Sequence, residues 1–341
     1  MLTAAYVGDR TIEVAEADPV PPAPGEVQVE VAYVGICGTD LHILHGAMDA
    51  RVSLPAVIGH EMSGTVAALG AGVTGWSVGD RVTVMPLDWD GTCPACRAGH
   101  QHVCQHLNFV GIDSPGALQG RWNVRADLLV PLPAGLSLQH AALVEPVAVA
   151  VHDVRRSELA AGDFGVVLGG GPIGALIALV AADAGAQVLV SEPDAGRRAL
   201  LGGLGLRTFD PAAADLAAHV EAWTGGAGAD VVFEVSGAAP AVAAATAVAR
   251  VRGTIVVVAI HPNPQPVDLK QVFWRELRIL GARVYERIDF ERAVELLDAA
   301  VVPAGALITE VVPLAEVADA FSTLESGQAM KVLVTVQEQT R

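Results

Sequence analysis

A glycine-rich run near the middle of the chain constrains the fold more than any other feature. Gly169, Gly171 and Gly174 form the motif G-x-G-x-x-G, with Pro172 and Ile173 in its variable positions. The motif follows a short apolar stretch and opens a helical one, which is the context that a dinucleotide-binding turn requires. The first glycine permits the tight turn, the second lets a pyrophosphate approach the backbone, and the third lets helix and strand pack closely. The free N–H groups at the start of the helix then favour a phosphate.

The chain after this motif alternates between apolar strands and helices. We expect strands at 165–168, 187–191, 230–235, 254–259 and 277–281. We expect helices between them at 172–184, 195–204, 213–223 and 240–251. This alternation predicts a parallel sheet that is covered by helices on both faces. The sequence after residue 285 predicts, in order, a helix, a strand, a helix and a strand at 290–299, 308–312, 314–325 and 331–336.

The first 150 residues have a different pattern. Apolar residues alternate with polar ones at 27–33, and glycine and proline interrupt the chain often. Short strands with frequent turns predict a β-barrel or a sandwich. A length of 341 residues also suggests two domains.

Composition excludes several classes of protein. With 52% hydrophobic and 17% charged residues the chain is not disordered, and four cysteines are too few for a disulfide scaffold. The net charge of −17 argues against nucleic acid or an anionic membrane as a partner. The uncharged stretch 164–182 is broken by glycines and a proline, so we expect no membrane span, and we see no signal peptide. The expected compartment is the cytoplasm.

The strand ends predict the other cofactor contacts. Glu192 ends the strand after the glycine motif, where a carboxylate accepts hydrogen bonds from ribose hydroxyls and repels a 2′-phosphate. This favours NAD over NADP, although Arg197 lies nearby and could weaken the discrimination. Ser236, Ala259 and Ile260 end later strands and are expected at the same edge of the sheet, unless they are strand ends only.

Residues of zinc-ligand type are scattered through the first domain. Cys37, the pair His60–Glu61 and Glu145 offer a thiolate, an imidazole and carboxylates. Three such ligands with one open position make a catalytic zinc site. Spacing alone does not bring these residues together, and an isolated cysteine is often a small buried apolar residue.

The order of these motifs resembles the zinc-dependent medium-chain dehydrogenases, and most closely their polyol branch of sorbitol, butanediol and threonine dehydrogenases. The resemblance implies a GroES-like β-barrel catalytic domain formed by residues 1–151 and 286–341, and a Rossmann domain at 152–285. It also implies a homo-oligomer, either a dimer or a tetramer.

The same resemblance assigns roles around the catalytic zinc. Cys37, His60 and Glu145 would surround the metal, and Glu61 would ligate it directly or alternate with Glu145 or a water. Asp40 would hold the second nitrogen of the His60 ring. Thr39 would be the first group of a proton relay that ends at His42 and passes through the nicotinamide ribose.

A second group of zinc-ligand residues has local spacing. Asp90, Cys93, Cys96 and Cys104 form the pattern D-x2-C-x2-C-x7-C. The family carries a structural zinc in a lobe, here about 88–106, with cysteine at all four positions. A carboxylate can replace one thiolate, so zinc is expected. Alternatives are a lobe that has lost its metal, a disulfide, or replacement of Asp90 by one of the histidines at 100, 102 and 106, which are otherwise solvated loop residues.

The substrate pocket is also placed by resemblance. It would be lined by Cys37, Thr39, Glu145 and the segments 44–48 and 109–114. Within these segments, His45, Asp113 and Ser114 could bond substrate hydroxyls. Arg121 could meet an acidic sugar or form a surface ion pair.

The sequence therefore predicts a zinc-dependent oxidoreductase that transfers a hydride between NAD(H) and a secondary alcohol of a polyol, sugar or vicinal diol. The alternatives are a threonine or simple-alcohol dehydrogenase, and a non-catalytic nucleotide-binding protein of the same fold. Zinc-free reductases of this fold lack the cysteine, histidine and glutamate set.

Overall fold

The computed structural model describes residues 1–327 and 329–337. The chain divides into two compact units, one formed by residues 1–145 and 286–341, the other by residues 146–285. The expected boundary at 151/152 falls inside a single helix, α4 (Val144–Ser157), in which the first unit ends at Glu145.

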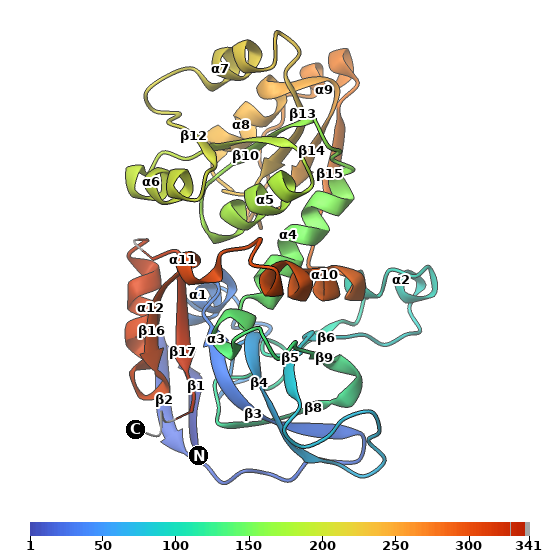
Figure 1. Ribbon diagram of the computed structural model, residues 1–341, viewed down its shortest axis with the longest axis vertical. Coiled ribbons are helices and arrows are strands. Elements are labelled where there is room, and N and C mark those ends of the chain that lie inside the picture. Colours follow the sequence, from blue (N-terminus) through green and yellow to red (C-terminus); the bar gives the residue numbers. More distant parts are fainter. Residues whose placement is uncertain (328, 338–341) are drawn as a thin grey trace. The chain divides into compact units, whose positions relative to one another are not determined.

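The second unit is built on one parallel sheet of six strands (Figure 1). The strands are β10 (Phe164–Leu168), β11 (Gln187–Ser191), β12 (Arg207–Phe209), β13 (Ala229–Glu234), β14 (Ala249–Val257) and β15 (Arg278–Gly281). Their order across the sheet is β12-β11-β10-β13-β14-β15, and every pair is parallel. Numbered along the unit this is 3-2-1-4-5-6, the Rossmann order. The order reverses beside β10, so the glycine motif after β10 lies where such sheets bind ligands.

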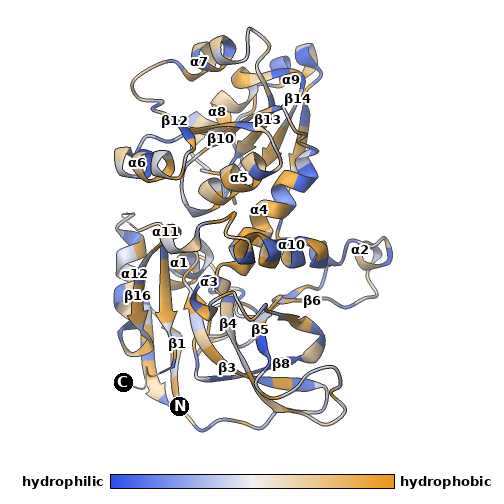
Figure 2. Cartoon of the chain, viewed as in Figure 1, coloured by the Kyte–Doolittle hydropathy of each residue, from blue (hydrophilic) through white to orange (hydrophobic). Residues whose placement is uncertain are grey.

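Helices connect these strands. They are α5 (Pro172–Asp183), α6 (Ala195–Gly203), α7 (Leu216–Trp223), α8 (Ala239–Val248) and α9 (Leu269–Arg275). Helix α5 is apolar almost throughout (Figure 2), and residues 174–181 are all buried. It contains most of the uncharged stretch that resembled a membrane span. In the part of the chain that the structure describes, no helix is both long and apolar enough to cross a membrane.

One expectation for this unit was wrong in detail, and two elements were not expected. The helix expected to run to residue 251 ends at Val248, because β14 begins at Ala249. Strand β12 and helix α9 were not expected. Both are short, and α9 has no buried residue that would produce a periodic apolar pattern.

The first unit is centred on a sheet of seven strands. The path β16-β17-β3-β4-β5-β9 forms most of this sheet, and β8 pairs with β3. These strands are β3 (Glu26–Gly35), β4 (Glu61–Leu69), β5 (Arg81–Val84), β8 (Arg121–Arg125), β9 (Leu129–Pro131), β16 (Ile308–Pro313) and β17 (Lys331–Thr335). The apolar residues of β3 at 27, 29 and 31 are fully buried, as their alternation predicts. Strand β17 pairs with β3, so both ends of the chain contribute to one sheet.

Two small ribbons and several short helices complete this unit. The ribbons are β1 (Leu2–Gly8) with β2 (Thr11–Glu16), and β6 (Leu87–Asp88) with β7 (Asn108–Phe109). The helices are α1 (Gly38–Leu44), α2 (Pro94–Arg97), α3 (Leu138–Ala141), α10 (Arg287–Asp298), α11 (Ala304–Leu307) and α12 (Val317–Glu325). The helix expected at 314–325 begins with a 3-10 turn at Leu314–Glu316.

Candidate functional site

A buried group of potential metal ligands lies in the first unit, where β3, α1 and β4 meet. The ligand atoms of Cys37, His60 and Glu61 all lie within 4.8 Å of one another, and we call these three residues the core cluster. Cys37 directly precedes α1, and Glu61 is the first residue of β4. Gly59 turns the chain before His60 with a φ of 101°, a value that L side chains rarely adopt. The two segments thereby bring a thiol, an imidazole and a carboxylate together.

Asp40 lies behind His60, as the resemblance implies. Its Oδ1 is 3.6 Å from Nδ1 of His60, which is an ion-pair distance and too long for a hydrogen bond. Its Oδ2 accepts the backbone N–H of Cys37 at 2.9 Å. Phe109 packs its ring edge-on to the imidazole, with 5.3 Å between the ring centroids. The imidazole is therefore confined between a carboxylate and an aromatic ring.

The electrostatics of the core cluster favour a cation. Burial alone lowers the pKa of His60, but the charge of Asp40, and then Cys37 and Glu145, outweigh burial and raise it to about 10. Burial raises the pKa of Asp40, which is fully enclosed. Nδ1 of His60 and Oδ1 of Asp40 are buried without a hydrogen-bond partner. A positive ion held by the thiolate, the imidazole and the carboxylate satisfies this surplus of negative charge, so the residues fit a zinc ion.

Lys331 contacts the core cluster and was missed by the sequence analysis. Its ammonium group forms an ion pair with Oε2 of Glu61 and donates a hydrogen bond to the carbonyl of Ile36 at 3.3 Å. Burial lowers its pKa, but the charges of Glu61 and Cys37 outweigh this effect and raise it. The chain has only two lysines, and this one lies inside the apolar run 329–334. A lysine in a buried strand requires a partner, and this was the available signal.

The structure separates the two candidate glutamates. Glu61 belongs to the core cluster, whereas Glu145 lies outside this group of close ligand atoms. Glu145 is buried in the first turn of α4, and its charge acts on both His60 and Lys331. Glu145 therefore lies near the core cluster but outside the set of three close ligand atoms.

The expected relay residues lie on α1. Thr39 is half-buried and His42 is exposed. Residues three positions apart share one face of a helix. Thr39 and His42 therefore lie on one face of α1, on which His42 is exposed to solvent.

Three other side chains expected to contact substrate form ion pairs within the protein. His45 forms an ion pair with Glu325, and Asp113 forms one with Arg51. Arg121 pairs with Glu30 at 3.1 Å, which is the surface ion pair considered as its alternative role.

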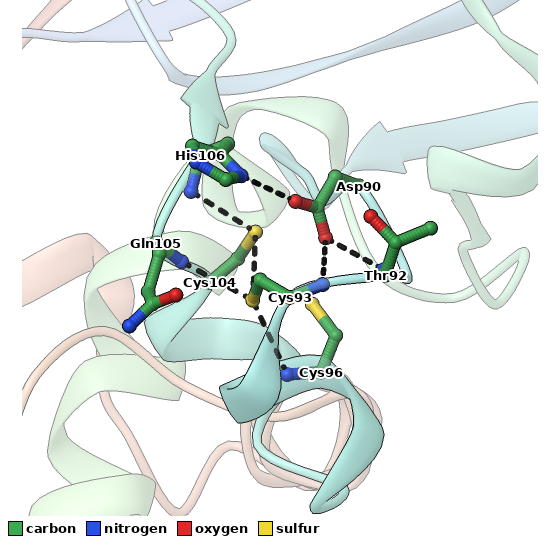
Figure 3. Close-up of polar contacts among 7 residues, drawn as sticks. All are labelled: Asp90, Thr92, Cys93, Cys96, Cys104, Gln105 and His106. Carbon is green, nitrogen blue, oxygen red and sulfur yellow. Dashed lines mark hydrogen bonds and ion pairs between the residues drawn. The ribbon is translucent and has the colours of Figure 1, made fainter.

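The second group of metal-ligand residues forms a compact lobe around α2. The ligand atoms of Asp90, Cys93, Cys96 and Cys104 all lie within 4.8 Å of one another, and we call these four the lobe cluster (Figure 3). All four cysteines of the chain, Cys37 included, are free, so the lobe contains no disulfide. Cys93 and Cys104 place their sulfur atoms 3.8 Å apart.

Hydrogen bonds and burial give the lobe cysteines different pKa values. The N–H groups of Gln105 and Cys96 lower the pKa of Cys93 to about 7, whereas burial raises that of Cys96 to about 12. A divalent cation would stabilise all three sulfurs as thiolates. Three thiolates and a carboxylate are zinc ligands, so this donor set also fits a zinc ion.

His106 is an exposed loop residue, as the sequence suggested, and it also contacts a potential ligand of the lobe. Its Nδ1 lies 2.5 Å from Oδ2 of Asp90 (Figure 3). The backbone N–H of Cys93, then His106 and the N–H of Thr92, hold the pKa of Asp90 well below its usual range. Asp90 in turn raises the pKa of His106. His106 contacts Asp90 and does not replace it in the lobe cluster.

The glycine motif of the second unit has the geometry of a phosphate-binding turn. Gly169 has a φ of 113°, and a methyl group on it would lie 2.9 Å from the side chain of Ser236. A methyl group on Gly174 would overlap the carbonyl oxygen of Gly169. At Gly171 the nearest atom is 3.9 Å away, so the backbone there is open. Pro172 and Ile173 then begin α5, whose free N–H groups face the same turn. The motif fits a pyrophosphate.

Glu192 is buried, and it is bonded to the same turn. Its two oxygens accept the N–H groups of Gly170 at 2.7 Å and of Asp194 at 2.8 Å. Arg197 lies in α6 with Nη1 nearest to the open position at Gly171. A carboxylate and a guanidinium therefore both lie beside the phosphate-binding turn.

The remaining expected cofactor residues follow strands of the same sheet. Ser236 follows β13, and its hydroxyl donates to Glu234 at 3.1 Å. Ala259 is half-buried and Ile260 is exposed after β14. All three lie at the carboxyl edge where ligands of such sheets bind.

Two family models match the chain. Residues 23–134 match the alcohol dehydrogenase GroES-like domain, and residues 172–299 match the zinc-binding dehydrogenase domain. These matches confirm the expected fold of a GroES-like domain together with a Rossmann domain.

Individual relatives extend over almost the whole chain. The protein is 53% identical to the 2-dehydro-3-deoxy-L-galactonate 5-dehydrogenase of Pseudoalteromonas atlantica, over 98% of both chains. It is 34% identical to the sorbitol dehydrogenase of Halalkalibacterium halodurans, over 92% of this chain and 93% of that one. A zinc-binding dehydrogenase of Sinorhizobium meliloti, solved with NADP, has a TM-score of 0.92 at 32% identity, over 98% of this chain and 99% of that one. The chain therefore belongs to the zinc-dependent medium-chain alcohol dehydrogenases and is an oxidoreductase of small-molecule alcohols.

Proposed function

We propose that this enzyme oxidises a secondary alcohol of a polyol or sugar acid to a ketone, reversibly, with a zinc ion at the core cluster and NAD as hydride acceptor. The observation that carries the proposal is the core cluster itself. A thiol, an imidazole and a carboxylate converge there in a buried region of negative charge. Burial of charged groups costs free energy, and a protein that only binds a nucleotide does not need this arrangement.

The residues of the chain have separate tasks in this reaction. Cys37 and His60 would hold the zinc, with Glu61 as the third ligand, and zinc would supply a Lewis acid that lowers the pKa of a bound hydroxyl. Asp40 orients the ring of His60 from behind. Thr39 would accept the hydroxyl proton and pass its own proton through the nicotinamide ribose to His42, which is exposed and would release it to water.

Glu145 has a task distinct from that of Glu61. It lies close enough to raise the pKa of His60, yet outside the group of closest ligand atoms. We propose that Glu145 is a second carboxylate that would hold the zinc, in alternation with Glu61. A carboxylate in place of a second thiolate also gives the pocket an acceptor for substrate hydroxyls.

The substrate class follows from the relatives. The 53% identical protein is named for a sugar acid, and the 34% identical one for a polyol. Both substrates carry several neighbouring hydroxyls, which favours this class over threonine or a simple alcohol. Within this class, the proposed substrate is a six-carbon sugar acid.

NAD is the proposed cofactor. Glu192 is fixed by two backbone N–H groups beside the phosphate-binding turn, so its negative charge is held where it would repel a 2′-phosphate. Arg197 acts in the opposite direction, and the Sinorhizobium meliloti protein was solved with NADP. Both cofactors therefore belong in the assay.

A homo-oligomer, a dimer or a tetramer, is the proposed assembly. Strand β15 is an edge of the Rossmann sheet, and near it Phe273 and Trp274 of α9 are 73% and 69% exposed. An unpaired edge strand beside exposed aromatic residues is suited to a second copy. The mass in solution tests this assembly. The free thiols of both clusters are suited to a reducing compartment, and the proposed location is the cytoplasm.

A substrate panel tests the proposed function. The purified enzyme is mixed with NAD or NADP and with sugar acids, polyols, aldoses, vicinal diols, threonine and simple alcohols, and reduced nicotinamide is followed by absorbance. We expect the largest kcat/KM with a sugar acid or polyol and NAD, abolished by a zinc chelator and restored by zinc. Turnover of simple alcohols alone would contradict the substrate class. Absence of turnover in zinc-loaded protein that binds NADH would favour the non-catalytic alternative.

A further inference from the structure

The exposed histidine beside the lobe cluster makes contact with two of its potential ligands. Its Nδ1 lies 2.5 Å from Oδ2 of Asp90, and its backbone N–H donates to Sγ of Cys104 at 3.3 Å (Figure 3). The side chain of His106 is 73% exposed. Because the side chain of His106 is exposed, burial does not hold it in place. Its position therefore depends on its polar contacts.

Asp90 differs from the cysteines in the number of contacts that it must satisfy. A carboxylate has about four lone-pair sites on its two oxygens. Oδ1 accepts the N–H groups of Thr92 at 2.7 Å and of Cys93 at 2.9 Å, which uses both of its sites. Oδ2 accepts His106, and the Cys96 thiol, which also contacts the carboxylate, would lose its proton to a bound metal and leave one site of the carboxylate open. The free lone pair of Asp90 is therefore on the oxygen that His106 holds.

We propose that His106 is a positioning residue of the lobe metal site, which orients the Asp90 carboxylate so that Oδ2 presents its remaining lone pair to the zinc ion. A thiolate needs no such help, because a single sulfur atom binds the metal from any rotation of its bond to Cβ. A carboxylate can rotate both oxygens away from the metal. In this chain Asp90 thus has beside it a histidine that fixes the carboxylate.

The variant His106→Ala tests this proposal in the full-length, zinc-loaded enzyme. The readout is the affinity of the lobe for Zn²⁺, measured by competition with a chromophoric chelator. The lobe zinc is identified as the zinc that is lost in Cys96→Ser. Loss of an outer partner of a metal ligand weakens metal binding by about 10–100-fold, and we expect this range. The backbone N–H to Cys104 survives the substitution, so the loss reports on the side chain.

Three further variants separate positioning from other roles. His106→Asn places an amide N–H near the position of Nδ1, and we expect it to restore most of the affinity. Asp90→Cys removes the need for orientation, so His106→Ala should have no effect in that background. His100→Ala changes another exposed histidine of the same lobe and should leave the affinity unchanged.

The outcomes that would overturn the proposal are distinct. Unchanged zinc affinity in His106→Ala would show that Asp90 needs no positioning. An equal loss with and without Asp90→Cys would show that His106 binds the metal itself or stabilises the loop. Replacing Zn²⁺ by Co²⁺ gives an independent reading. The sulfur-to-metal absorption bands should persist in His106→Ala once Co²⁺ saturates the lobe, because the three thiolates are intact.

Discussion

The core cluster and the lobe cluster contain the same pair of side chains in opposite order. In the core cluster a histidine is the potential ligand, and a carboxylate, Asp40, lies behind it. In the lobe cluster the carboxylate Asp90 is the potential ligand, and His106 lies behind it. We expect the second member to orient the first in both places. A partner behind a metal ligand fixes the orientation of that ligand, whether it is a ring or a carboxylate.

The two clusters differ most in their surroundings. His60 and Glu61 are 3% and 1% exposed and lie next to the buried charges of Asp40 and Lys331. The lobe cluster is assembled within one short segment, and the side chain of His106 is in solvent. Buried charges interact more strongly than exposed ones because water screens them less. Substitutions in the core cluster should therefore be the more damaging.

The largest expected effect follows from Cys37→Ser. Loss of the thiolate removes zinc from the core cluster, and with it a Lewis acid worth several kcal/mol, so kcat/KM should fall by about 10³-fold or more. The lobe should keep its zinc, so the metal content falls from two ions per chain to one. Metal analysis and steady-state kinetics measure both effects. An active variant with unchanged zinc content would disprove the assignment of the core cluster.

A second large effect is expected on stability. In the zinc-free protein, Lys331→Met leaves the carboxylate of Glu61 buried without a cation, and loss of one partner of a buried ion pair costs about 3–5 kcal/mol. Thermal or urea unfolding measures the loss. The double variant Lys331→Met with Glu61→Gln removes both charges and should recover much of the stability. Equal stability of the single variant and the parent protein would show that the pair is dispensable.

An intermediate effect is expected from Asp40→Asn. The amide keeps the size of the side chain but removes the charge behind His60, so zinc affinity of the core cluster should fall by about 10–100-fold. This change is directly comparable with His106→Ala in the lobe. Chelator competition on both variants would show whether Asp40 increases zinc affinity more than His106 does. A larger loss of zinc affinity in His106→Ala would contradict the expectation that the buried pair contributes more.

The smallest effect on turnover is expected from Cys96→Ser. The lobe should lose its zinc and become sensitive to proteases near residues 88–106, because a structural metal contributes folding free energy. The kcat/KM should change by less than about tenfold, which is under about 1.4 kcal/mol. Limited proteolysis and kinetics on the same sample test this separation. Loss of activity equal to that of Cys37→Ser would show that the two clusters are not independent.

Much of the fold could be predicted from local patterns. The order of apolar strands and helices from residue 165 onward, and the glycine motif between β10 and α5, required no knowledge of distant contacts. The errors lie where the local signal is weak. Strand β12 spans three residues and α9 buries none of its own, so neither produces a periodic apolar pattern. The extent of α8 was overestimated because an alanine- and valine-rich segment continues unchanged into β14.

The lobe cluster was equally visible in the sequence, because its four residues lie within one short segment with metal-site spacing. The role of His106 was not visible. Three histidines lie in that segment, and only the path of the chain after Cys104 selects the one that contacts Asp90.

The sequence by itself determined the Rossmann unit, the phosphate-binding turn and the lobe cluster, because each depends on residues that are neighbours along the chain. Only the tertiary structure decided the core cluster. It brings Cys37 to His60 and Glu61 across two strands, and it places Lys331 of the last strand against Glu61. It also places Glu61 among the three close ligand atoms. Contacts between residues that are far apart in sequence are fixed by sheet pairing and burial, and no local spacing encodes them.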